Sequence, residues 1–127
     1  MYKTFYRISV TEDDSCEVVF QAFRKDLNSA HKVLKEWKEK MAQKGYIRFG
    51  KNFHDYLGDW SMSLLYSHIY DSDKPNYTIC VDNSVTLTDW NNGKKFIIYG
   101  LEEQQEFTSK NDAVEYLKEL EWKSKQI

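Results

Sequence analysis

The chain has 127 residues, a length that fits one domain and is short for two. Its 18 basic and 20 acidic residues leave a formal net charge of −2, which argues against a freestanding binder of double-stranded DNA, because such proteins neutralise phosphates with a basic excess. No apolar run approaches the roughly 18 residues of a membrane-spanning helix, and the first residues lack a signal-peptide pattern, so we expect a cytoplasmic protein with no membrane partner.

Two alternating segments at the start of the chain predict a β-hairpin. Residues 3–10 alternate apolar and polar side chains, which is the period of a strand. A polar turn over residues 11–15 follows, and residues 16–24 resume the alternation.

A helix is predicted over residues 28–44. The segment Asp26-Leu27-Asn28-Ser29 is a start signal, in which Asn28 or Ser29 is expected to cap the free backbone N–H groups. Gly45 is the expected end of the helix. The apolar face consists of residues at helical spacing: Ala30, Val33, Leu34, Trp37 and Met41.

The middle of the chain predicts a short strand, a loop and a longer strand. Residues 46–49 are the short strand, and the segment from His54 to Trp60 has no clear period, which predicts a loop. Alternation returns from Trp60 to Tyr70, and the polar residues 71–76 form a turn.

The next segments predict further strands. Residues 77–81 and 85–90 read as two strands split by residues 82–84. Asn91-Asn92-Gly93 is a strong hairpin signal because Asn and Gly adopt a positive φ at low cost, and residues 95–101 then return as the partner strand.

A second helix is predicted over residues 109–122, beginning with a capping-box pattern at Ser109. Strands and helices do not alternate regularly, which argues against a parallel doubly wound sheet. The expected architecture is therefore a single α+β domain over residues 1–127, with a largely antiparallel sheet of five to seven strands and two helices packed on it.

The two cysteines, Cys16 and Cys80, both fall in segments predicted as strands. Neither belongs to a C-x-x-C pair, and zinc needs clustered ligands, so we expect no cysteine-based metal site. Reduced, partly buried thiols are expected, and a Cys16–Cys80 disulfide remains the alternative.

Residues with chemical potential are few. The pair His54-Asp55 is the one place where a general base stands beside a carboxylate, and with Trp60 it defines one hypothesis, a small enzyme or ligand-binding protein. The acidic pairs Asp55/Asp59 and Asp71/Asp73 are interpreted as turn residues, so no metal or cofactor is expected.

Aromatic residues are unusually frequent, with 4 Trp, 9 Tyr and 7 Phe. Such rings serve single-stranded nucleic-acid binders as stacking platforms when Lys and Arg are interleaved with them. The first hairpin comes closest to this pattern, which supports a second hypothesis, an RNA- or single-strand-binding module. Its residues are Lys3, Phe5, Tyr6, Arg7, Phe23, Arg24 and Lys25.

We favour a third hypothesis, a non-catalytic protein-binding module acting as an inhibitor, such as a toxin-neutralising immunity protein or a phage-encoded antagonist of a host system. Residues 1–53 carry a net charge of +4 and residues 54–127 a net charge of −6. A positively charged partner would therefore be attracted to residues 54–127. Acidic groups around an aromatic anchor would speed association and slow release. The residues expected to bind the partner are Asp55, Tyr56, Asp59, Trp60, Trp90, Glu102 and Glu103.

Overall fold

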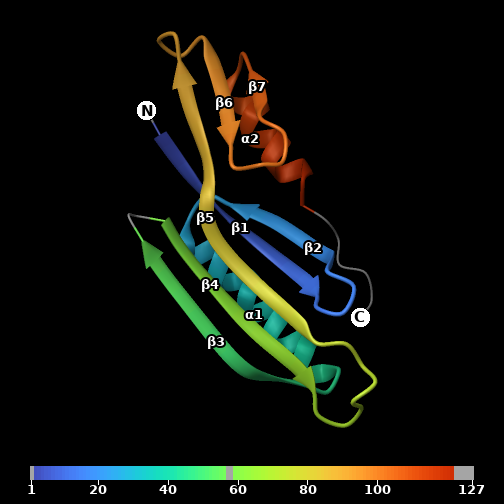
Figure 1. The fold of residues 1–127 in the computed structure, drawn as a ribbon. Coiled ribbons are helices and arrows are strands. Elements are labelled where there is room, and N and C mark those ends of the chain that lie inside the picture. The colour runs from blue at the N-terminus through green and yellow to red at the C-terminus, as the bar shows by residue number, and fades with distance from the viewer. Residues whose placement is uncertain (1, 57–58, 122–127) are drawn as a thin grey trace.

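The computed structural model describes residues 2–56 and 59–121, in which seven antiparallel strands and two helices are formed (Figure 1). This confirms the predicted α+β class. In chain order the elements are β1 (Tyr2–Glu12), β2 (Glu17–Arg24), α1 (Leu27–Gln43), β3 (Tyr46–Tyr56), β4 (Asp59–His68), β5 (Tyr77–Trp90), β6 (Lys95–Tyr99), β7 (Gln105–Phe107) and α2 (Lys110–Glu119).

The long strand β5 holds the sheet together. The main strand order is β2-β1-β5-β4-β3, and β6 followed by β7 continues from the far part of β5. On one side of β5, β1 pairs along both parts of the strand. On the other side, β4 pairs with the first part and β6 with the second. Two smaller sheets therefore share β1 and β5 (Figure 1).

A β-bulge in β5 separates the two parts. Arg7 of β1 lies opposite Asp82, whereas Phe5 lies opposite Val85, so β5 carries one extra residue. The extra residue shifts the two-residue period, and odd-numbered side chains change face. The predicted pair of strands 77–81 and 85–90 is thus one continuous strand, and residues 82–84 are a bulge in it and not a break.

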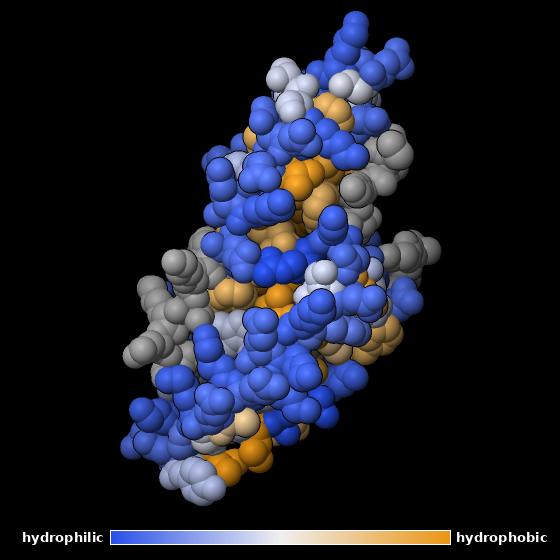
Figure 2. Space-filling model, turned by 180° about the vertical axis from the view of Figure 1, so that it is seen from behind, coloured by the Kyte–Doolittle hydropathy of each residue, from blue (hydrophilic) through white to orange (hydrophobic). Residues whose placement is uncertain are grey.

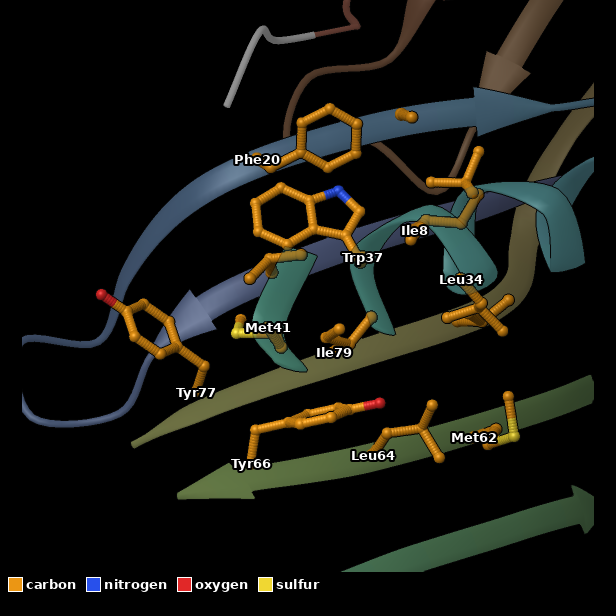
Figure 3. Close-up of a cluster of buried hydrophobic side chains, with 14 of the residues drawn as sticks. Ile8, Phe20, Leu34, Trp37, Met41, Met62, Leu64, Tyr66, Tyr77 and Ile79 are labelled. Atoms are coloured by element: carbon orange, nitrogen blue, oxygen red, sulfur yellow. The ribbon is translucent and has the colours of Figure 1, made fainter. Parts of the chain in front are cut away.

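The larger buried cluster lies between α1 and the first part of the sheet (Figure 3). Trp37 of α1 packs against Phe20 of β2 with ring centroids 5.2 Å apart, and Ile79 of β5 is fully buried below the helix. Asp26 caps α1, because its carboxylate accepts the Ser29 N–H at 2.7 Å. The predicted helix is confirmed, but its cap is Asp26 and not Asn28 or Ser29.

A smaller buried cluster joins α2 to the second part of the sheet. Ala22 of β2 belongs to the larger cluster and Phe23 to the smaller one. Neighbouring residues in a strand point to opposite faces, so α1 and α2 cover opposite faces of the twisted sheet. Arg24 of β2 also pairs with Glu121, just after α2, at 2.8 Å.

The predicted loop from His54 to Trp60 is wrong for residues 54–56 and 59–60, which are strand, whereas residues 57–58 lie outside the described residues. β3 continues to Tyr56 and β4 already begins at Asp59. The segment lacks a visible period because β3 is an edge strand that is largely exposed on both faces. Earlier in the same strand, Phe49 is an extra residue between the pairs Arg48–Tyr66 and Gly50–Leu65, and it shifts the alternation there.

Two further expectations, on the cysteines and on the second hairpin turn, are settled by the structure. Cys16 is not in a strand: it is an exposed turn residue with φ of +58°, and both it and the half-buried Cys80 are free thiols. A short strand, β7, lies between the second hairpin and α2, and the sequence did not reveal it. The Asn91-Asn92-Gly93 hairpin turn is confirmed, with a positive φ at all three residues.

In the part of the chain that the structure describes, no helix is long and apolar enough to cross a membrane.

Candidate functional site

The end of the β3–β4 hairpin brings together three of the residues predicted to bind a partner. Asp55 lies opposite Trp60 in the strand register, and Asp59, the first residue of β4, directly precedes Trp60. Both carboxylates are exposed. The Tyr56 backbone pairs with Asp59, whereas the Tyr56 side chain lies outside the described residues.

Trp60 is an anchor of the hairpin rather than a free surface ring. It is half-buried against the larger cluster, and its ring contacts Tyr6 and Phe53 edge-on, at centroid distances of 6.0 and 5.6 Å. Its backbone N–H donates to the Asn83 side-chain oxygen at 2.5 Å. Trp60 therefore ties the hairpin to β1 through its ring and to β5 through its backbone N–H, and part of the residue remains accessible.

Trp90, Glu102 and Glu103 lie elsewhere. Trp90 is 49% exposed at the end of β5, and the strand distance from Asn83, beside Trp60, is roughly 23 Å. Glu102 and Glu103 line a cleft of about 400 Å³ in the connection after β6. The predicted residues therefore fall into separate groups: the hairpin end, the cleft lined by Glu102 and Glu103, and Trp90 at the end of β5.

The exposed edge of β3 was missed by sequence reasoning. Ile47, Phe49 and Phe53 are 50%, 54% and 55% exposed, although all three are large apolar side chains of one strand. Two more exposed apolar residues, Ile69 and Tyr70, directly follow β4, the neighbour of β3. Seen from the side opposite to that of Figure 1, the surface is mainly hydrophilic, with separate apolar patches among the hydrophilic atoms (Figure 2).

This apolar edge has a weak signal in the sequence. Apolar residues that follow neither a helical nor a strand period indicate a segment whose side chains are not all buried by one neighbour. The bulge at Phe49 interrupts the two-residue period of the strand, so these exposed apolar residues were not recognised as members of one strand.

The hairpin end does not hold a paired acid and base. His54 and Asp55 are adjacent in β3, and their side chains point to opposite faces of the strand. Among residues 2–56 and 59–121, no three His, Cys, Asp or Glu side chains come together as a metal site would require.

The first hairpin is also poorly arranged for stacking bases. Phe5 and Phe23 are each 4% exposed because α2 covers them. Arg7 bonds to Asp82 and Arg24 bonds to Glu121. Both phenylalanine rings of that hypothesis are therefore buried, and both guanidinium groups are already paired with carboxylates of the same chain.

Comparison of the chain with protein-family models, with curated proteins and with solved structures gave no match. The functional argument therefore rests on the surface geometry described above.

Proposed function

We propose that this protein is a non-catalytic protein-binding module whose docking element is the outer edge of β3. One observation carries the proposal. In the described part of the chain β3 pairs with β4 alone, and it still presents Ile47, Phe49 and Phe53 to solvent. An edge strand offers a row of unpaired backbone N–H and C=O groups to an incoming strand, and exposed apolar side chains beside such an edge mark a protein interface.

The acidic end of the hairpin supports the same role. Asp55 and Asp59 are exposed where β3 meets β4, so a partner segment that carries a basic side chain would be attracted toward the docking strand. Covering a partner's surface without chemical change is how an inhibitor acts, and this is the biological role we propose for the module.

The test is capture of a partner with the immobilised full chain. We expect Phe53→Asp to weaken binding by more than about 2 kcal/mol, roughly thirtyfold, because it places a charge on the exposed apolar edge of β3. Trp90→Ala, at the far end of β5, is the matched control and is expected to retain the partner. A partner lost with Trp90→Ala and retained by Phe53→Asp would place the binding site on the β5–β6 hairpin and overturn the proposal.

A further inference from the structure

The second part of β3 is complementary to itself. It reads Lys51-Asn52-Phe53-His54-Asp55, with a cation and an anion at equal distances on either side of Phe53. All five side chains are exposed. We propose that two copies of this protein pair antiparallel through β3, with Phe53 at the two-fold axis. This inference rests on the proposed docking role of β3 and names the partner as a second copy of the chain.

Antiparallel pairing around Phe53 aligns opposite charges. Lys51 of each copy lies opposite Asp55 of the other, and Phe53 faces its own counterpart. These side chains share the α1 face of β3. Their register partners on β4 are Leu64, Met62 and Trp60, which belong to or pack against the larger cluster under α1. Side chains directly opposite each other in such a pair are about 5 Å apart, and both aromatic pairs and opposite charges stabilise it. Two ion pairs would thus flank one aromatic pair.

The charges select this register over its neighbours. A dyad at Lys51 places the two lysines opposite each other, which is destabilising. A dyad at Asn52 pairs Lys51 with Phe53, and a dyad at His54 pairs Phe53 with Asp55. Among these four centres, Phe53 alone aligns Lys51 with Asp55.

The bulge limits where pairing takes place. The extra residue Phe49 interrupts the regular edge of β3, and a bulge is one of the devices that prevent indiscriminate strand pairing. Regular pairing is therefore confined to the stretch that starts at Gly50, and this stretch contains the self-complementary residues. The product is one continuous sheet across both copies.

Sedimentation velocity of the full chain, with circular dichroism to confirm folding, tests the proposal. The wild-type chain is expected to dimerise. Lys51→Asp and Asp55→Lys each place two pairs of like charges in the interface, so each is expected to weaken self-association about tenfold or more. The controls Lys94→Asp and Asp73→Lys change the net charge equally at exposed turn positions and are expected to leave the dimer intact.

Mixing provides the sharper result. An equimolar mixture of the Lys51→Asp chain and the Asp55→Lys chain restores opposite charges at every interface position, so the two are expected to form a heterodimer. The double variant Lys51→Asp/Asp55→Lys is expected to self-associate again. A monomeric wild-type chain at about 100 μM, a dimer that ignores the single reversals, or a mixture that stays monomeric would each overturn the proposal.

These outcomes are separate from failure of the proposed function. If the wild-type chain is monomeric and Phe53→Asp still abolishes capture of another protein, β3 is a docking strand for a different partner and only the second-copy inference fails. If neither self-association nor capture depends on Phe53, both fail.

Discussion

Tyr77 contacts Tyr46 at the end of the larger cluster, with ring centroids 5.4 Å apart, and its side chain is 4% exposed. Burial raises the pKa of Tyr77 to about 12, with smaller contributions from Tyr46 and the negative charge of Glu12. The folded protein therefore retains the phenolic proton at a pH where the unfolded chain loses it.

This pKa difference predicts an alkaline loss of stability. Because the folded pKa of Tyr77 lies above its ordinary value of 10.0, its contribution to stability is complete below about pH 10 and is lost as the pH rises toward 12. We expect Tyr77→Phe, which has no proton to lose, to reduce the slope of unfolding free energy against pH in this window. Equal slopes for the two proteins in urea titrations would contradict this.

Two glycines with similar backbone angles predict different costs of substitution. Gly100 has φ of +93°, and a Cβ there would overlap the Ser84 carbonyl oxygen, whereas Gly93 has φ of +81° and open space around it. We expect Gly100→Ala to destabilise the fold by more than about 2 kcal/mol, and Gly93→Ala by about 1 kcal/mol, the cost of the left-handed conformation alone. Equal shifts in the urea midpoint would show that the contact with Ser84 is relieved cheaply.

At the scale of elements, Arg7 stabilises the bulge of β5 through hydrogen bonds. Its guanidinium donates to Asp82 Oδ2 through Nε and Nη2, at 3.2 and 3.1 Å. It also donates to the Gly100 carbonyl at 3.1 Å and to Ser84 Oγ at 3.3 Å. One planar group thus joins β1, both sides of the bulge and the residue that follows β6.

We expect Arg7→Ala to cost about 1–3 kcal/mol of unfolding free energy because it leaves a half-buried carboxylate without its partner. Arg7→Lys is expected to recover only a small part, since an ammonium group does not reproduce the fork of donors. The control is Lys118→Ala, which breaks an ion pair with Glu115 whose side chains are 66% and 61% exposed, and a change within about 0.5 kcal/mol is expected there. Full recovery by lysine would show that charge alone matters.

At the scale of the whole molecule, the two buried clusters predict two regions of different stability. They lie on opposite faces and in different parts of the sheet, joined through β1, β2 and β5. The smaller cluster depends on α2, whose Leu117 is 1% exposed. Regions with fewer buried contacts open more readily than the rest of a fold.

Hydrogen exchange tests this division. Leu117→Ala is expected to remove about 2–5 kcal/mol from the smaller cluster and to speed amide exchange in β6 more than in β4. Leu64→Ala, in the larger cluster, is the matched control and is expected to show the reverse preference. A uniform acceleration in both variants would mean that the protein opens as one unit.

The elements that were predicted correctly from the sequence depend on nearby residues. The spacing of Ala30, Val33, Leu34, Trp37 and Met41 identifies α1 and its buried face, because a helical period repeats within one segment. The hairpin turn at Asn91-Asn92-Gly93 is equally local, since each residue adopts the positive φ that its type tolerates. The α+β class follows from the order of such segments.

Only the tertiary structure decided that β5 is continuous across Asp82 and that β3 lies at the edge of the sheet. Both features depend on residues far apart in sequence: Arg7 meets Asp82 across the sheet, and β3 is an edge because it pairs with β4 alone among the described residues. The same fact explains the candidate site. Sequence reasoning identified Asp55 and Asp59 from their charge. The exposure of Phe53 depends on which strand lies at the edge of the sheet. The sequence does not contain this information, because a phenylalanine is the same residue type whether it is buried or exposed.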